Sequence, residues 1–127
     1  MHLNSTRILK ENLESLYKEN LLCDTNLKTK TGSFPAHKSI HSARSTVFKE
    51  MFTHNMKEKN SEYVYMEDLN DDTVQRLLQY IYTATLLDLQ WDSACNLYAA
   101  ADKYEIPSLK SECSSFFKDC LSHYKSL

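Results

Sequence analysis

The sequence contains very little glycine and proline. Its 127 residues include one glycine and two prolines, whereas an average composition would give about nine glycines. A phosphate-binding P-loop, a dinucleotide-binding turn and the nucleophile elbow of serine hydrolases each need two or three glycines, because the backbone there turns sharply or approaches a ligand closely. These sites are therefore excluded, as are collagen, glycine-rich linkers and low-complexity disorder.

An excess of basic charge and long apolar runs are also missing. The chain has 15 basic and 17 acidic side chains and a net charge of −2, whereas a nucleic-acid-binding domain is usually basic. No apolar run approaches the roughly 20 residues of a membrane span, and the N-terminus lacks the apolar segment of a signal peptide. We expect an intracellular protein of the nucleus or the cytoplasm, with neither nucleic acid nor membrane as a partner.

The remaining composition is that of a globular domain. Hydrophobic residues make up 42% and charged residues 25% of the chain, close to globular averages. A chain of this length buries roughly two-thirds of its unfolded surface, which is enough for a substantial core. We expect one domain over residues 1–127, with its core at about residues 9–121.

The cysteine spacing does not indicate a metal or redox site. No pair has C-x-x-C spacing, so neither a zinc knuckle nor a thioredoxin-like site is expected. In a reducing compartment, free thiols pack as small apolar side chains. We expect buried structural thiols at the four positions, which are Cys23, Cys95, Cys113 and Cys120.

Apolar periodicity predicts a helix followed by a hairpin. Segment 6–20 repeats apolar residues along one helical face, and Ser5 is its expected N-cap. Strand-forming segments at 24–30 and 33–36 then flank a turn at Gly32, where positive φ is often needed.

The rest of the chain adds a strand and several helices. Pro35 has no N–H, so the second hairpin strand should be short or lie at a sheet edge. Segment 62–66 is the candidate for a third strand, Ser45 and Asn70 are expected helix caps, and Pro107 fits the first turn of the last helix. The sequence therefore predicts an α+β fold with a small three-stranded sheet and about six helices.

No group of residues supports catalysis or a cofactor. His37 and His41 are four residues apart and would share a helical face. They would supply the histidine half of a metal-binding motif. A neighbouring glutamate and a third ligand at suitable spacing are missing, and neither a Ser/His/Asp nor a Cys/His signature is present. We expect no enzyme activity, no metal and no cofactor.

Two apolar features point to protein partners. The first helix carries a leucine stripe, which either docks on the protein's own core or forms a self-association face. Met56 stands alone in a polar segment; such a methionine is either unremarkable or part of an adaptable interface. The stripe consists of Leu9, Leu13, Leu16 and Tyr17.

Several motifs, in order and at matching spacing, resemble the BTB/POZ domain. The N-terminal ones are Leu22-Cys23-Asp24, the Phe34–Lys38 run and the Ala43–Phe52 run; the C-terminal ones are Tyr80–Thr83, Leu97–Tyr104 and Leu109–Cys113. The Ala99–Tyr104 run and the N-terminal spacing are most similar to the speckle-type POZ (MATH–BTB) group. The resemblance implies the BTB/POZ fold and a non-enzymatic assembly module.

The resemblance also implies a homodimer formed through the first helix, so the leucine stripe becomes an interface stripe. The family's near-buried acidic residue at the dimer pocket falls on Asp24, and its basic partner falls on Lys38. A buried charge needs a partner, so the two are expected to pair within or across subunits. The alternative is that Asp24 only caps the start of the strand.

Many members of this family recruit cullin-3 and act as substrate adaptors of ubiquitin ligases. Their apolar-x-Glu motif is similar to Met56-Lys57-Glu58 here, so Met56 would insert into an apolar pocket and Glu58 would meet a helix end or a basic group. Tyr63 and Tyr82 are expected as further cullin contacts. The alternative is a corepressor-recruiting module of a transcription regulator.

Two departures from the family pattern stand out. Ala84 occupies a position where the family often has glycine, and a left-handed backbone there would cost alanine about 1 kcal/mol. The substrate-binding MATH domain and the C-terminal helical extension of speckle-type proteins are expected to be absent from this chain. Any substrate protein would then bind through a domain outside it.

Overall fold

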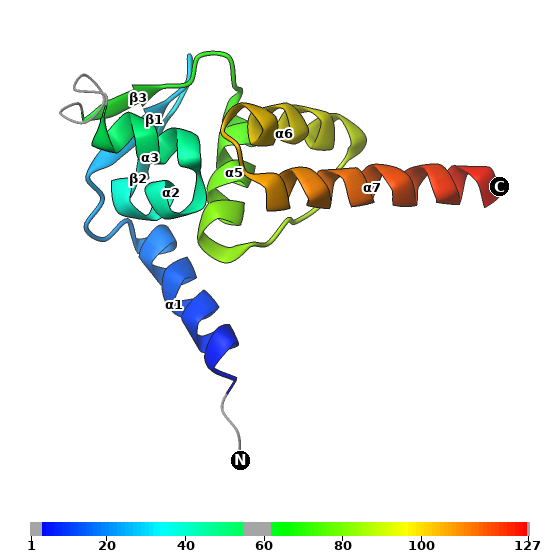
Figure 1. Ribbon diagram of the computed structural model, residues 1–127, viewed down its shortest axis with the longest axis horizontal. Coiled ribbons are helices and arrows are strands. Elements are labelled where there is room, and N and C mark those ends of the chain that lie inside the picture. The colour runs from blue at the N-terminus through cyan, green and yellow to red at the C-terminus, as the bar shows by residue number, and fades with distance from the viewer. Residues whose placement is uncertain (1–3, 55–61, 127) are drawn as a thin grey trace.

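The computed structural model describes residues 4–54 and 62–126. Within these residues the chain forms six helices and three strands, which confirms the predicted α+β fold (Figure 1). In chain order the elements are α1 (Ser5–Glu19), β1 (Thr25–Lys28), β2 (Ser33–Ala36), α2 (Lys38–Arg44), α3 (Thr46–Thr53), β3 (Tyr63–Tyr65), α5 (Asp71–Thr83), α6 (Trp91–Lys103) and α7 (Pro107–Ser126).

The sheet is mixed, with strand order β2-β1-β3. β1 and β2 form the expected antiparallel hairpin, in which Leu27 pairs with Phe34, while β3 adds to the other side of β1 in parallel, with Val64 beside Leu27. Pro35 therefore lies in an edge strand, as its missing N–H predicts. The helices α2 and α3 form the crossover between β1 and β3 that a parallel pairing requires.

Gly32 ends the hairpin turn for a different reason from the expected one. Its φ is not positive. A Cβ at this position would instead lie 2.9 Å from two ring atoms of Phe34 and 3.0 Å from Oδ1 of Asp71. The turn also donates hydrogen bonds from the hydroxyls of Thr29 and Thr31 to Asp71, the first residue of α5. Glycine is thus needed for the close packing of the turn on α5.

Helix caps are mostly where the sequence places them. The Asn70 side chain accepts a hydrogen bond from Thr73 N–H at 2.8 Å, and α7 begins at Pro107, so both predictions are confirmed. The first helix is capped by Asn4, whose Oδ1 accepts from Arg7 N–H at 3.0 Å, so the predicted Ser5 cap is wrong by one residue.

Ser45 has two roles in the fold. As the predicted N-cap of α3, its Oγ accepts a hydrogen bond from Phe48 N–H at 3.0 Å. The same hydroxyl donates to the carbonyl of Tyr104, at the end of α6, at 2.5 Å. The side chain is buried. One hydroxyl therefore both begins α3 and joins it to the α6–α7 connection.

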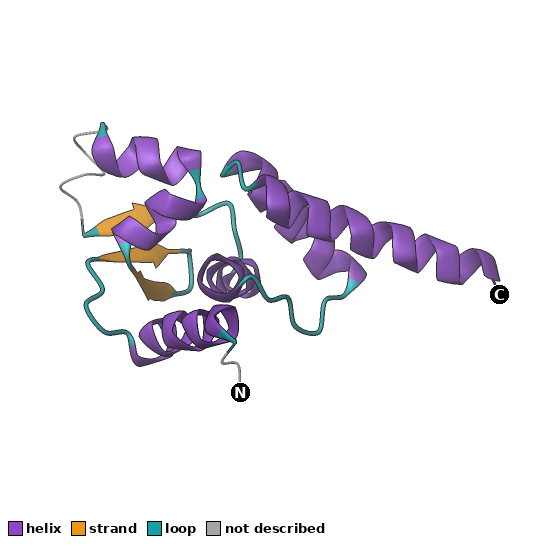
Figure 2. Cartoon of the chain, turned by 60° about the horizontal axis from the view of Figure 1, so that its bottom comes forward, coloured by secondary structure: helices purple, strands orange, loops and turns teal. Residues whose placement is uncertain are grey.

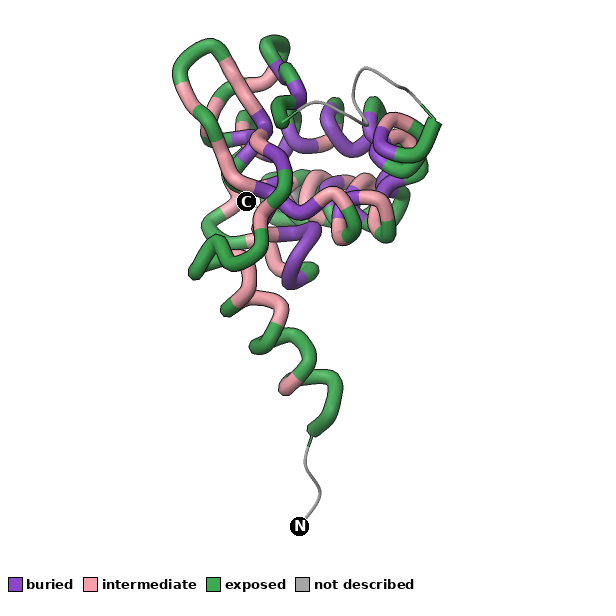
Figure 3. The backbone as a smooth tube through the Cα atoms, turned by 90° about the vertical axis from the view of Figure 1, so that its left-hand side faces the viewer, coloured by how far each residue is buried: buried purple, intermediate pink, exposed green. Residues whose placement is uncertain are grey.

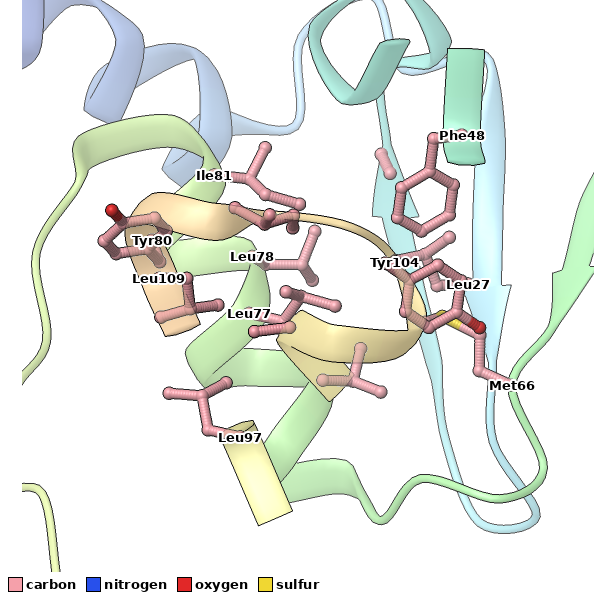
Figure 4. Packing of buried hydrophobic residues seen from close by; sticks show 14 of the residues in the cluster. Leu27, Phe48, Met66, Leu77, Leu78, Tyr80, Ile81, Leu97, Tyr104 and Leu109 are labelled. Atoms are coloured by element: carbon pink, nitrogen blue, oxygen red, sulfur yellow. The ribbon is translucent and has the colours of Figure 1, made fainter. Parts of the chain in front are cut away.

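The core forms around α5, which lies between the sheet with α2 and α3 on one side and α6 with α7 on the other (Figure 2). Buried side chains from all these parts meet around it (Figure 4). The labelled ones are Leu27, Phe48, Met66, Leu77, Leu78, Tyr80, Ile81, Leu97, Tyr104 and Leu109. α5 ends at Thr83, and its C-cap Ala84 has φ 56° and ψ 31°, so the left-handed conformation considered from the sequence is present.

The two terminal helices project from this body (Figure 1), and Figure 3 shows α1 extending away from it with mostly exposed residues. α1 contains no buried residue, and the last described turns of α7 are exposed, with Tyr124 at 76%. Among residues 4–54 and 62–126, no helix is long and apolar enough to cross a membrane.

Candidate interaction interface

α1 has a helical stripe of apolar side chains that its own chain covers only in part. Leu9 is 58% exposed, and Leu13, Leu16 and Tyr17 are half-buried. On the polar side, ion pairs join Lys18 to Glu14 at 2.7 Å and Arg7 to Glu11 at 3.8 Å. An amphipathic helix that buries none of its residues leaves part of its apolar face available for a partner.

One aromatic contact fixes the C-terminal end of α1 to the body. The rings of Tyr17 and Tyr82 stack with centroids 5.0 Å apart and an interplanar angle of 21°. Burial raises the pKa of Tyr17 above its ordinary value, and the neighbouring Lys18 partly offsets this. Beside the stack, a groove of about 530 Å³ runs between α1, β2, α5 and the α5–α6 loop, with Phe34 and Leu86 in its lining. This stack therefore attaches the C-terminal end of α1 to the body.

A hydrogen-bond network around His37 supports this attachment. The backbone N–H of His37 donates to the Tyr82 hydroxyl at 3.1 Å, and that hydroxyl lies 2.5 Å from His37 Nδ1. His37 Nε2 contacts the carbonyl of Leu21. A neutral imidazole with its proton on Nε2 satisfies every group, because Tyr82 then donates to Nδ1 and Nε2 donates to Leu21. Burial raises the pKa of Tyr82 above its ordinary value, which keeps the phenol protonated as this network requires.

The predicted cullin contacts differ in how far the structure exposes them. Tyr82 is 2% exposed, so the prediction that it meets a partner directly is wrong; α5 is buried on nearly every side and Tyr82 serves the internal network. Tyr63 is 37% exposed, and the Lys28 ammonium lies 3.8 Å from its ring centroid. Met56 and Glu58 lie outside the described residues.

Asp24 is exposed in the single chain, so the expectation of a near-buried carboxylate does not hold for one copy alone. Its Oδ1 accepts a hydrogen bond from the backbone N–H of Lys38 at 2.8 Å, at the first residue of α2. Its own N–H donates to the carbonyl of Ala36 at 3.1 Å. A carboxylate at this place stabilises the positive end of α2. The ammonium of Lys38 lies 5.8 Å from the ring centroid of Phe52.

The two histidines considered as a metal pair have separate roles. His37 is the N-cap residue of α2 rather than part of the helix, and His41 is fully buried with its ring edge-on to Phe48 and Tyr82. Its Nδ1 donates to the His37 carbonyl at 3.1 Å, and its Nε2 has no partner. Burial lowers the pKa of His41 to about 4. Across the described part of the chain, no three His, Cys, Asp or Glu side chains gather as a metal site requires.

The cysteines are less uniform than predicted. Cys113 is buried, and burial with the nearby Glu112 raises its pKa to about 11. Cys95 is exposed and the other two thiols are half-buried, so the expectation of buried thiols is wrong for them. Cys23 Sγ lies 3.7 Å from His37 Nε2, yet partial burial and Asp24 raise its pKa. That thiol is therefore not activated.

Sequence reasoning missed the turn between α1 and β1. Leu21 is 51% and Leu22 is 89% exposed, and Asn20 and Leu22 both have positive φ. Asn20 could have been found, because asparagine is a frequent left-handed residue at a helix C-terminus. Nothing in the local pattern signals that two leucines would follow it into solvent.

Comparison with known proteins then identifies the family. A family model described as the BTB/POZ domain matches residues 13–121. This chain belongs to the BTB/POZ family. The BTB/POZ fold is also that of the BTB domain of zebrafish PATZ1, which matches with a TM-score of 0.76 at 22% identity over 94% of this chain and 98% of that one. BTB domains are interaction modules that mediate dimerisation and protein binding.

Curated BTB/POZ relatives are longer than this chain. A BTB/POZ domain-containing protein of Arabidopsis thaliana is 37% identical over 109 residues, which cover 86% of this chain and 33% of that protein. Protein maternal effect lethal 26 of Caenorhabditis elegans is 35% identical over 114 residues, 89% of this chain and 29% of that protein. TD and POZ domain-containing protein 1-like of Mus musculus is 37% identical over 111 residues, 87% of this chain and 30% of that protein. The chain thus spans about a third or less of these relatives.

Proposed function

We propose that this BTB/POZ domain forms a homodimer through α1 and recruits cullin-3, so that it acts as a substrate adaptor of a ubiquitin ligase. The observation that carries the homodimer is the state of α1 in the single chain. The helix projects from the body, has an apolar stripe at helical spacing and buries none of its residues. Burying that stripe against a partner is the main stabilisation open to it.

A second copy of the chain fits this stripe. In a symmetric pair each copy uses the same surface, so Leu13 and Leu16 of one chain would meet their counterparts in the other. Leu9, the most exposed member at 58%, would gain the most from being covered. Asp24 follows α1 in the chain and accepts a hydrogen bond from the backbone N–H of Lys38, and pairing of two copies there would remove its carboxylate from solvent. The resemblance assigns these two residues to the dimer pocket.

The cullin-3 part of the proposal depends on the Met56-Lys57-Glu58 motif between α3 and β3. A methionine is a flexible apolar anchor for a partner's pocket, and a neighbouring carboxylate gives direction through a helix end or a basic group. Tyr63 adds an exposed aromatic surface at the start of β3. Tyr82 is no longer part of this set, because it is buried.

We further propose that the chain is closest to the speckle-type POZ group, on the Ala99–Tyr104 run, and that it forms one domain over residues 1–127. Its substrate protein would bind through a domain outside this chain, and it would act in the nucleus or the cytoplasm. We propose no catalytic role.

The homodimer is tested by light scattering at micromolar concentration. Wild type is expected to have twice the mass of one chain, and Leu13→Asp is expected to be a monomer because a charge would enter the apolar stripe. Leu121→Asp is the matched control, since it changes an exposed leucine on the surface of α7. A monomeric wild type rejects the homodimer, and a dimeric Leu13→Asp shows that the stripe packs elsewhere.

Cullin recruitment is tested by binding of the N-terminal region of cullin-3. The double variant Met56→Asp/Glu58→Lys is expected to lose binding, while Lys57→Ala, at the variable position of the motif, is expected to keep it. A wild type without affinity for cullin-3 contradicts the adaptor role. Binding of corepressor peptides by that same protein would instead support the transcription-regulator alternative.

A further inference from the structure

The turn that follows α1 has an unusual combination of backbone and side-chain features. Asn20 has φ 53° and Leu22 has φ 61°, so both lie in the left-handed region. Leu21 is 51% exposed and Leu22 is 89% exposed, the largest exposed fraction among the large hydrophobic residues of the described chain. A leucine is thus held in a conformation that suits glycine or asparagine, with its side chain in water.

Both features cost free energy in the single chain. The left-handed region brings Cβ close to the following carbonyl oxygen, a clash that leucine cannot avoid. An exposed leucine also forgoes the stabilisation that burial would give it. Strained backbone of this kind is retained where surrounding structure fixes it and where it serves a function.

The surrounding structure does fix this turn. The backbone N–H of Asn20 donates to the Tyr17 carbonyl at 3.3 Å, which ends α1, and His37 Nε2 donates to the carbonyl of Leu21. His37 is itself held by Tyr82. The leucines are therefore presented from a rigid base, as an interface anchor requires.

We propose that Leu21 and Leu22 anchor the α1 interface and that a second copy of this chain covers them. The inference rests on the proposed homodimer and deepens it. The turn starts at the end of α1 and ends two residues before Asp24, so it lies along the chain between the two groups of residues assigned to that interface. A partner seated on both groups would also cover the turn.

The place of the turn in the chain favours a second copy over another partner. The turn joins the apolar stripe of α1 to Asp24, and the proposed homodimer covers both. In a symmetric pair the second copy therefore reaches the turn without the need for another surface.

The variant Leu22→Gly tests whether Leu22 is an interface anchor or an ordinary loop residue. Glycine accepts the left-handed conformation, so in the monomeric Leu13→Asp background the thermal midpoint is expected to rise. In the otherwise wild-type chain, the dimer dissociation constant is expected to rise about a hundredfold or more, because the anchor is lost twice in a symmetric pair. Leu22→Asn tolerates the same backbone and is expected to weaken the dimer similarly.

Leu87→Gly is the matched control, since it alters a 60% exposed leucine in the α5–α6 loop and should leave dimerisation unchanged. A monomeric wild type rejects the homodimer itself. A dimeric wild type that Leu13→Asp dissociates, but whose dissociation constant Leu22→Gly and Leu22→Asn leave unchanged, overturns this inference alone. The same holds if those two variants weaken only the binding of the cullin-3 N-terminal region, because a different partner would then cover the turn.

Discussion

Tyr17 of α1 stacks on Tyr82 of α5, and Tyr82 in turn binds both the backbone N–H and the ring of His37. Tyr17 therefore connects the first helix to the centre of the fold. Because Tyr82 is buried, it holds α1 in place from within, while Leu9 at the other end of the apolar stripe stays exposed.

Tyr82→Phe is expected to lower the free energy of unfolding by about 1–3 kcal/mol. The phenylalanine keeps the ring that stacks on Tyr17 but leaves the N–H and Nδ1 of buried His37 without a partner. Chemical denaturation measures the change, with the exposed Tyr65→Phe as control. An unchanged free energy for Tyr82→Phe would show that the network contributes nothing to stability.

Ala84→Gly is expected to raise the free energy of unfolding by about 1 kcal/mol, since Ala84 ends α5 with φ 56° and glycine accepts that backbone without a Cβ clash. The matched control is Ala99→Gly at an exposed position inside α6, which is expected to lower stability by about 0.5–1 kcal/mol. Thermal denaturation distinguishes the two signs. A loss of stability in both variants would contradict the role given to the left-handed position.

Gly32→Ala is expected to lower the free energy of unfolding by about 1–3 kcal/mol, because the new Cβ would lie 2.9 Å from the Phe34 ring and must displace it. Ser33→Ala, at the exposed neighbouring residue, is expected to change stability little. Urea denaturation of both proteins is the measurement. Equal stability of the two variants would mean that the turn moves away from α5 at no cost.

Stability is expected to fall with acidification because of His41. Its pKa is about 4 in the folded chain and 6.5 ordinarily, so the folded state favours the neutral ring. The stabilisation is complete above pH 6.5 and is lost as the pH falls toward 4, by up to about 3 kcal/mol. The measurement is the unfolding free energy at pH 7.5, 5.5 and 4.5.

Two histidine variants serve as the comparison. His41→Asn keeps a donor near the position of Nδ1 but does not titrate, so its loss of stability between pH 7.5 and 4.5 should be smaller. The exposed His123→Asn should leave the wild-type pH dependence unchanged. Parallel pH profiles for wild type and His41→Asn would refute the assignment to His41.

Local chemistry made much of the fold predictable. A polar side chain before an apolar run identified the caps at Ser45 and Asn70, and proline geometry placed Pro107 and the edge strand. The parallel pairing of β1 with β3 was not predictable in this way. Periodicity shows that a segment is a strand, but the partner of Val64 is decided by packing across a long crossover.

Only some features of the candidate interface were predictable, because local spacing displays a helical stripe but not burial or exposure. The stripe of α1 is a property of one helix, so spacing alone displays it. The burial of Tyr82 depends on helices that surround α5, and the exposure of Leu22 depends on a backbone held by distant His37. Both properties arise from residues far apart in the sequence, which local patterns do not relate.

The hydroxyl of Ser45 has a consequence for how the fold opens. It begins α3 and at the same time holds the carbonyl of Tyr104, 59 residues away in sequence. If α6 and α7 detach, α3 loses part of its support, and if α3 frays, the α6–α7 connection loosens. The amides of α3 and of the α6–α7 connection should therefore exchange hydrogen in one cooperative opening, although different halves of the chain supply them.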